Sequence, residues 1–436
     1  MRVMVRAIAI VAALSVGSSI VGAKEKTPAD LSGDWIAELI PADTPNGEMD
    51  YVRFSLQQSG TTLTGIWRAA TITGSYKEGA IDIRLSSAPN NTYKGSVKSG
   101  EIAGTASVPR GELRWRAYRE APEKLQPKTY DFAPTRFHRL FSGSIAPALR
   151  IHSGDTVRTW TVDAGGADSA NVRRSEGGNP QTGPFYVEGA LPGDTLAIHL
   201  IKVRLNRDTA ISDGIISANA LDPGYNAAYK EQGTPVITWQ LDREQGVAKL
   251  KDAGDKLKNY TVPLRPMLGC IAVAPPQGMA FRTGYLGRYG GNLDYNRIRE
   301  GTTVYLPVFQ PGALLFVGDG HAAQGDGELT GNALETSLDL EFRVELIRNE
   351  SAGVPRAEDA EFRMAMGIAG SLNEAMQQAT TNMARWLQRD FKLNRAEVAY
   401  VLGNAMSYDI AEVVDPDYHV VARLPKDALS RISALP

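Results

Sequence analysis

The chain has 436 residues, of which 43% are hydrophobic and 22% are charged. This composition provides for a sizeable buried core, excludes a globally disordered chain and predicts two or three domains. The formal net charge of −2 at pH 7 provides no surplus of lysine and arginine to neutralise a phosphate backbone. We therefore expect no nucleic-acid partner.

The first 23 residues have the pattern of a signal peptide. Arg2 and Arg6 lie beside an apolar run from Ala7 to Val21, and small residues precede Lys24. The run is shorter than the roughly 20 residues that a membrane-spanning helix needs. We expect residues 1–23 to be removed and the mature chain to be periplasmic or extracellular, without stable membrane association. An uncleaved membrane anchor is the alternative.

Residues 31–118 are predicted to form a small all-β domain that resembles a barrel. Short runs with partial alternation, such as Val52–Leu56 and Thr62–Trp67, are separated by glycine, asparagine and serine at the spacing of hairpins. The segment has no histidine and no cluster of carboxylates. We expect an accessory domain, with a ligand-binding or partner-binding module as the alternative. Residues 119–135 carry three prolines and are typical of a linker.

Residues 136–436 are predicted to form a second domain that is mainly β with a C-terminal helical segment. Strand patterns lie at Thr195–Val203, Thr303–Phe309 and Leu338–Leu346, and the last alternates as a strand with one wet face does. Long loops rich in glycine, proline and asparagine separate them. In a compact domain, loops of that length are more often functional than not.

The composition near the C-terminus favours helices. Residues 357–390 have helical composition, with apolar side chains at steps of three and four residues: Leu372, Ala375, Met376, Ala379, Met383, Trp386 and Leu387. Asn394 and Glu397 have the spacing of a capping box and predict a second helix toward Met406. A final strand is expected at Tyr418–Leu424.

The densest group of polar residues follows the apolar run 312–317, which is typical of a buried strand. Asp319, His321, Gln324, Asp326 and Glu328 lie within ten residues, separated by glycines. Carboxylate and imidazole ligands suit a divalent metal such as zinc, or iron or manganese. On an extended strand Asp319 and His321 would share a face, and Glu328 could act as general base toward a water. The alternatives are a turn-rich loop of solvated acids and a calcium loop without EF-hand spacing.

Two further segments are candidates. The glycines of Gly290-Gly291-Asn292-Leu293-Asp294 favour a loop whose backbone cups a substrate, although an ordinary turn has the same pattern. Asp163 follows a predicted strand at residues 155–160 and precedes a glycine pair. That position suits a site residue, but solvated loop acids have the same pattern.

The other histidines and the single cysteine are weaker candidates. His138 lies near aromatic residues and would either approach the site or pack in the core. We expect a core position for His199 and an exposed strand position for His419. Cys270 lies in the apolar run 267–274, which favours a buried, inert thiol over a nucleophile. The chain has no Gly-x-Ser-x-Gly motif to support a serine nucleophile.

Taken together, residues 137 to about 425 resemble the acetamidase/formamidase family. The resemblance is carried in order by Ile151–Val157, Thr182–Ala190 with Pro192–Asp194, Gly269–Pro275, Gly290–Asp294 and Tyr305–Glu328. It implies a β-rich catalytic domain with a C-terminal helical segment. It also implies hydrolysis of the C–N bond of a small linear amide to carboxylate and ammonia, assisted by a metal.

The resemblance also implies roles for particular residues. By position, Asp163, Asp319 and His321 would hold a divalent metal, for which we expect zinc, and Glu328 and His321 would be catalytic. The side chains of Asn292, Asp294 and His138 and the backbone of Gly291 would contact the small amide substrate. Whether the chain forms a homo-oligomer is left open.

Two features depart from the family pattern. The signal sequence and the N-terminal β domain are additions, so we expect a substrate met outside the cytoplasm rather than acetamide itself. The alternative is an exported protein that binds a small ligand in the family pocket without turnover.

Overall fold

The computed structural model describes residues 30–42, 49–109, 111–120, 126–227 and 235–432. It divides into two compact units between Arg119 and Glu120. Both units are mainly β, with few helices, as the sequence predicts. The expected signal peptide, residues 1–23, lies outside the described residues. Within the described ranges, no helix combines the length and the apolar character that crossing a membrane requires.

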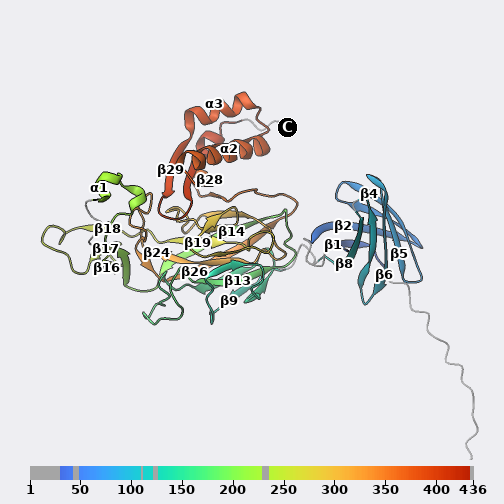
Figure 1. Ribbon diagram of the computed structural model, residues 1–436, viewed down its shortest axis with the longest axis horizontal. Helices are drawn as coiled ribbons and strands as arrows, with labels where there is room; N and C mark the ends of the chain where they lie inside the picture. The colour runs from blue at the N-terminus through green and yellow to red at the C-terminus, as the bar shows by residue number, and fades with distance from the viewer. Residues whose placement is uncertain (1–29, 43–48, 110, 121–125, 228–234, 433–436) are drawn as a thin grey trace, which may run out of the picture. The chain divides into compact units, whose positions relative to one another are not determined.

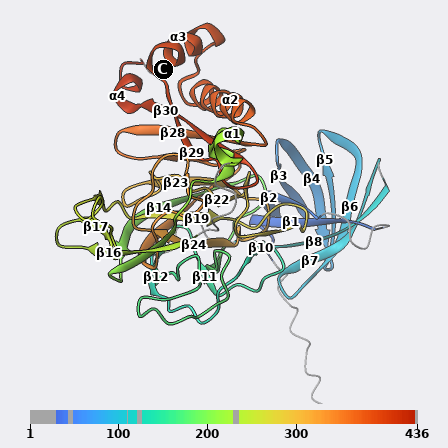
Figure 2. The same ribbon diagram turned by 60° about the vertical axis from the view of Figure 1, so that its left-hand side comes forward.

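The first unit is a closed barrel, in which each strand pairs with the next and the eighth pairs with the first (Figure 2). Its strands are β1 (Gly33–Pro41), β2 (Asp50–Ser59), β3 (Thr62–Trp67), β4 (Ala70–Lys77), β5 (Ala80–Leu85), β6 (Ala88–Lys98), β7 (Glu101–Val108) and β8 (Gly111–Arg119). Trp35, Trp67 and Trp115 are at most 4% exposed and pack inside it. Closure leaves no unpaired sheet edge. The predicted barrel-like domain is confirmed.

The second unit is built on two large sheets. The nine-stranded sheet has the order β29 (Ser407–Glu412), β30 (Tyr418–Pro425), β28 (Phe362–Ala369), β27 (Arg356–Glu358), β23 (Thr303–Pro307), β14 (Thr195–Leu205), β26 (Leu338–Ile347), β12 (Thr156–Trp160) and β9 (Thr129–Asp131). The burial of β26 alternates over most of its length, as the sequence predicts. This strand therefore has one face in the core and one toward solvent.

The other sheet carries the polar residues of interest. Its main order is β18 (Thr261–Pro263), β17 (Val247–Leu250), β16 (Val236–Asp242), β15 (Thr209–Asp213), β25 (Glu335–Thr336), β24 (Leu315–His321), β19 (Met267–Ala272), β22 (Gly290–Asn292) and β21 (Leu286–Gly287). β13 (Gln181–Val187) also pairs with β24, and β11 (Leu149–Ile151) pairs with β13. A separate pair is formed by β10 (Leu140–Ser142) and β20 (Ala280–Arg282).

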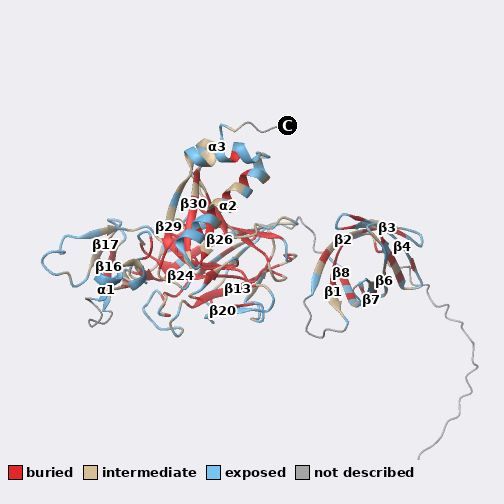
Figure 3. Ribbon diagram, turned by 45° about the horizontal axis from the view of Figure 1, so that its top comes forward, coloured by how far each residue is buried: buried red, intermediate tan, exposed pale blue. Residues whose placement is uncertain are grey.

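The main core contains side chains from both sheets. The rings of Phe185 on β13 and Phe342 on β26 lie 5.4 Å apart, and both side chains are fully buried. The buried residues concentrate in the middle of the unit (Figure 3). The central strands of the second sheet are consequently held in a close-packed interior, where side-chain positions are well determined.

The C-terminal helices lie near the C-terminal strands (Figure 1). They are α2 (Leu372–Phe391), α3 (Arg395–Ala405) and α4 (Lys426–Leu429), with η1 (Ala218–Ala220) and α1 (Pro223–Ala227) elsewhere in the chain. α2 packs its apolar face on β28 and β30. A Cβ at Gly367 would lie 1.9 Å from the carbonyl oxygen of Ala375, so only glycine permits this close approach. The predicted capping box of Asn394 and Glu397 is present at α3.

Three sequence predictions are corrected. Residues 357–369 were predicted to be helical but lie mainly in β27 and β28, because pairing with β23 and β30 overrides helix propensity. The helix α2 begins only after Ser371, whose hydroxyl caps it. His419, predicted to be exposed, is fully buried on β30 between β28 and β29. The strand predicted at 312–317 begins at Leu315 and continues through His321.

Candidate metal centre

The middle of the second sheet brings together residues from three neighbouring segments. Asp319 and His321 lie two positions apart on β24. His321 faces Glu335 in the pairing of β24 with β25. Ligand atoms of Asp319, His321 and Glu335 lie within 4.8 Å of one another, which confirms that the first two share a face. This group has the donor types of a metal site.

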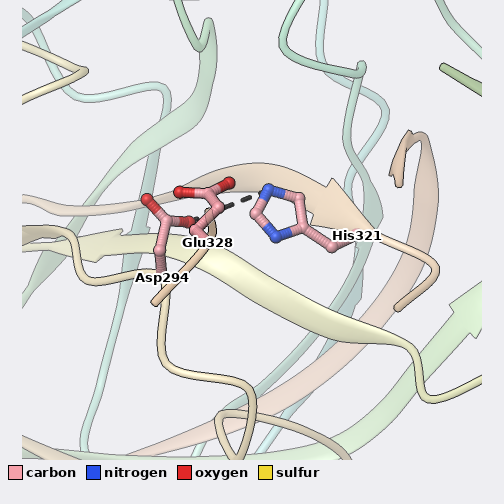
Figure 4. A group of neighbouring side chains, drawn as sticks. All are labelled: Asp294, His321 and Glu328. Atoms are coloured by element: carbon pink, nitrogen blue, oxygen red, sulfur yellow. Dashed lines mark ion pairs between the residues drawn. The ribbon is translucent and has the colours of Figure 1, made fainter. Parts of the chain in front are cut away.

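A second group shares the same histidine. Ligand atoms of Asp294, His321 and Glu328 also lie within 4.8 Å of one another, and Figure 4 shows the two carboxylates directed toward the imidazole ring. His321 Nε2 lies 3.2 Å from Glu335 Oε1, 3.6 Å from Asp319 Oδ2 and 3.8 Å from Asp294 Oδ1. Four carboxylates thus surround one imidazole.

These five side chains are buried and short of positive charge. Each is at most 6% exposed. In the part of the chain that the structure describes, no lysine or arginine forms an ion pair with any of the four carboxylates; three pair with His321. Asp294 Oδ1, Asp319 Oδ1 and Glu335 Oε2 are buried without a hydrogen-bond partner. Such atoms are costly to bury, so the centre fits a divalent cation.

The carboxylates raise one another's affinity for protons. Burial, together with the charges of Glu328 and Asp319, raises the pKa of Asp294 well above its usual range. Burial likewise raises the pKa of Glu328 well above its usual range, against the opposing charge of His321, and that of Glu335 to about 7. Burial lowers the pKa of His321, but the charges of Glu335 and Asp319 outweigh it and the net pKa is raised. The centre therefore favours uptake of positive charge.

Gln324 orients the imidazole ring. Its Nε2 donates to the carbonyl oxygens of Asp294, at 2.5 Å, and Ala411, at 3.3 Å, which leaves its Oε1 to accept from His321 Nδ1 at 2.9 Å. This arrangement assigns the proton to Nδ1 and directs Nε2 toward the carboxylates. Metal-ligating histidines are commonly held by such a hydrogen bond on the other ring nitrogen.

Two asparagines hold the acidic side chains. Asn179 Nδ2 donates to Asp319 Oδ2 at 3.1 Å and to Asn292 Oδ1 at 2.8 Å. Asn292 Nδ2 in turn donates to Asp294 and to Asp415, the latter at 2.8 Å. Burial raises the pKa of Asp415 to about 6. Asn292, predicted to contact substrate, therefore lies in the hydrogen-bond network behind the centre.

The backbone at the centre is in an uncommon conformation. Asp294, Asp319 and Glu328 have φ angles of 37°, 61° and 45°. Left-handed backbone is unfavourable for residues other than glycine and concentrates at functional sites. A Cβ on the neighbouring Gly269 would lie 2.5 Å from Asp294 Oδ1 and 2.7 Å from Asp319 Oδ2. Glycine at position 269 is what leaves room for both carboxylates.

Asp163 is placed away from both metal-ligand groups. Its Oδ2 accepts from Arg207 at 2.6 Å, and its Oδ1 accepts from the backbone N–H of Ala167 at 2.8 Å. Arg207 also donates to the carbonyl oxygen of Glu335 at 3.3 Å. Because a buried guanidinium already neutralises this carboxylate, we remove Asp163 from the expected ligands. Its contact with the centre is indirect, through Arg207.

The structure also shows where the other candidate residues, Gly291, His138 and Cys270, lie. Gly291 lies on β22 between β19 and β21, so the expected loop around a substrate is a strand inside the sheet. His138 is half-buried, with its ring 6.4 Å from that of Phe316, and burial lowers its pKa. Cys270 is fully buried; its Sγ donates to Asn292 Oδ1 at 2.7 Å, and burial raises its pKa. The buried position predicted for this thiol is confirmed.

Several residues of the centre were missed by sequence reasoning. Glu335, Asn179 and Asp415 carry no motif, and Gln324 was noted without a role. Asp294 was expected to contact substrate, yet it belongs to a group that could hold a metal. The pairing of β24 with β25 places Glu335, and an isolated glutamate before a strand offers no signal for such a role.

The geometry agrees with comparisons to known proteins. Residues 279–431 match the family model described as the Acetamidase/Formamidase family. A formamidase of Methylophilus methylotrophus is 40% identical over an alignment of 264 residues, which covers 49% of this chain and 65% of that protein. An acetamidase of Mycolicibacterium smegmatis is 40% identical over 68 residues, or 15% of this chain and 17% of that protein. These sequence matches span less than two thirds of each relative.

Solved structures extend the likeness over a larger share of the chain. A predicted acetamidase/formamidase from Thermoanaerobacter tengcongensis superimposes with a TM-score of 0.60 at 28% identity, covering 71% of this chain and all of that one. An acetamidase from Yersinia enterocolitica gives 0.61 at 29%, covering 70% and 94%. The chain belongs to the acetamidase/formamidase family. The region that matches the family model, residues 279–431, contains Asp294, His321, Glu328 and Glu335.

Proposed function

We propose that this chain hydrolyses the C–N bond of small linear amides to a carboxylate and ammonia, with a divalent metal ion at the buried centre. The observation that carries the proposal is His321 surrounded by four buried carboxylates, three of which have an oxygen atom without a partner. Its relatives are named formamidase and acetamidase. An amide resists water strongly, so hydrolysis needs both an electrophile and a proton shuttle.

The donor set is suited to a metal. Asp319, His321 and Glu335 would hold it, and Asp294 and Glu328 form a second group of donors with the same imidazole. One nitrogen donor and several carboxylate oxygens suit zinc, which we propose, and also suit manganese or iron. When bound, such an ion polarises an amide carbonyl and lowers the pKa of a water.

Glu328 is proposed as the proton shuttle. The backbone N–H of Ala333 donates to its Oε1 at 3.0 Å and fixes the carboxylate. Burial raises its pKa, so this carboxylate binds a proton more readily than an ordinary glutamate does, as proton transfer requires. Glu328 takes a proton from water as the water oxygen bonds to the amide carbon. It then returns that proton to the amide nitrogen as the C–N bond breaks, so ammonia leaves, and the carboxylic acid that remains loses its proton to solvent and becomes the carboxylate.

The test combines metal analysis with an assay for released ammonia. The full mature chain is purified, stripped with a chelator and reloaded with zinc, manganese or iron. We expect bound metal at the centre and ammonia release that disappears on stripping and returns on reloading. Metal-loaded chain that binds amides without turning any over would reject the proposal in favour of the binding-protein alternative.

We also propose export of the chain, on the basis of residues 1–23 alone. The basic start, the apolar run and the small residues before Lys24 support it. Sequencing the N-terminus of the protein from fractionated cells tests this proposal. A mature chain that begins at Lys24 outside the cytoplasm supports it, whereas an intact Met1 in the cytoplasm rejects it.

A further inference from the structure

A large cavity lies directly beside the metal centre. Its volume is about 710 Å³, and Glu328 and Gln324 form part of its wall. Much of the remaining wall comes from β15 to β18, which extend from the body of the unit (Figure 1). The residue proposed to shuttle protons and the residue that orients His321 therefore both border this space. A substrate in the cavity would lie next to the proposed chemistry.

The wall of this cavity is mainly apolar. The apolar and aromatic side chains that line the cavity are Ile215, Ile216, Ile237, Trp239, Leu250, Leu257, Tyr260, Val262, Leu329 and Leu334. The rings of Trp239 and Tyr260 lie 6.4 Å apart. Trp239 Nε1 donates to Ser212 Oγ at 2.9 Å, so the polar atom of the indole is satisfied and its ring is left for apolar contact.

Several of these side chains are exposed although they are apolar. Leu257 is 49% exposed, Tyr260 50% and Leu329 46%. Clustered exposed apolar surface marks a binding site more often than single exposed residues do. Three charged residues also line the cavity: Asp213 accepts from Asn332 at 2.7 Å, Glu328 accepts from the backbone N–H of Ala333, and Arg265 is the third. The occupant that best matches this wall is uncharged and apolar.

The size of the cavity excludes a fit to the smallest amides. Cavities of about 300–1,000 Å³ hold ligands of drug size, so formamide or acetamide would leave most of this space unfilled. We propose that the substrate is a primary amide with an aryl-alkyl or branched acyl group, which contacts Trp239 and Tyr260 while its carbonyl lies at Glu328. This inference rests on the proposed amide hydrolysis and names its substrate class.

The first experiment compares substrates on the metal-loaded full chain. Ammonia release is measured with formamide, acetamide, hexanamide and phenylacetamide. We expect kcat/KM for phenylacetamide to exceed that for acetamide at least tenfold, because each apolar group in a matching pocket favours its substrate by about tenfold or more. Equal or better use of acetamide overturns the inference while leaving amide hydrolysis intact.

The second experiment tests the wall itself. Tyr260→Ala and Leu329→Ser change half-exposed side chains, and Tyr400→Ala on α3, 71% exposed, is the matched control. We expect each wall variant to lower the ratio of kcat/KM for phenylacetamide over acetamide at least fivefold, and the control to leave that ratio unchanged. An unchanged ratio in both wall variants overturns the inference. The inference is also overturned if the chain is a dimer and both variants dissociate it without changing the ratio, because the wall would then contact a second copy.

A binding measurement separates this inference from the proposed function. Calorimetry with phenylacetamide and acetamide on metal-loaded Glu328→Gln chain measures affinity without turnover. Tighter binding of phenylacetamide supports the cavity, even if the unaltered chain hydrolyses neither amide, in which case the proposed function alone fails. Equal affinity for the two amides rejects the cavity as the substrate site.

Discussion

His321 Nε2 lies 3.2 Å from Glu335 Oε1 across the pairing of β24 with β25. Both side chains are at most 3% exposed. Since Gln324 accepts from Nδ1, Nε2 is the nitrogen that faces the carboxylates. Backbone pairing thus sets the contact between the imidazole and this carboxylate, so the geometry of the centre depends on the register of the sheet.

Replacing Asp319 by asparagine tests whether its charge holds a metal. We expect Asp319→Asn to weaken zinc binding at least about tenfold while the chain still folds, because asparagine tolerates the φ of 61° at this position. Metal content after dialysis and the melting temperature are the measurements. Asp326→Asn, an exposed acid of the same motif, is the control. Full metal content in Asp319→Asn would remove Asp319 from the ligands.

Replacing Glu328 by glutamine tests the proton shuttle. We expect kcat to fall by about 10² or more, the usual range for loss of a general base, with folding intact because the amide oxygen can still accept from Ala333 N–H. Ammonia release and circular dichroism are compared with Glu361→Gln, an exposed control. Activity within a fewfold of the unaltered chain would mean that another group carries the proton.

Replacing Asp163 by asparagine separates structural support from metal binding. Asp163 pairs with Arg207, and both side chains are at most 5% exposed. We expect Asp163→Asn to lower the free energy of unfolding by about 3 kcal/mol, because the guanidinium stays buried without its counter-charge, and to leave metal content unchanged. Urea unfolding and metal analysis measure the two effects. Loss of the metal with unchanged stability would restore Asp163 as a ligand.

We expect buried His419 to make the free energy of unfolding depend on pH. Burial lowers its pKa from 6.5 to about 4, despite the hydrogen bond from Nδ1 to the carbonyl oxygen of Leu293. The unfolded chain therefore takes up the proton first. The stability that neutral His419 contributes is complete above pH 6.5 and is lost as the pH falls toward 4. The whole difference is about 3 kcal/mol.

A substitution isolates this contribution from the other titrating groups. Urea unfolding of the unaltered chain and of His419→Gln is measured from pH 7.5 to about 4. We expect the stability of the unaltered chain to fall more steeply than that of His419→Gln below pH 6.5. Parallel curves would show that His419 does not titrate between the folded and unfolded states.

Local patterns in the sequence carried much of the fold. Alternation of apolar and polar residues predicted the barrel strands and β26, and steps of three and four residues predicted most of the buried face of α2, although Leu372 and Met376 are exposed. The spacing of Asp319 and His321 predicted their common face, and motifs in order indicated the acetamidase/formamidase family. Each of these features depends on residues close together in the chain, so its physical cause is visible without the fold.

Only the tertiary structure decided which residues form the metal centre. Glu335 joins it through strand pairing, Asp294 through the space that Gly269 leaves, and Asp163 is held outside it by Arg207. Pairing between strands likewise made residues 362–369 a strand and buried His419. Such contacts join residues distant in sequence, and their energies come from burial and packing, which local propensity does not contain.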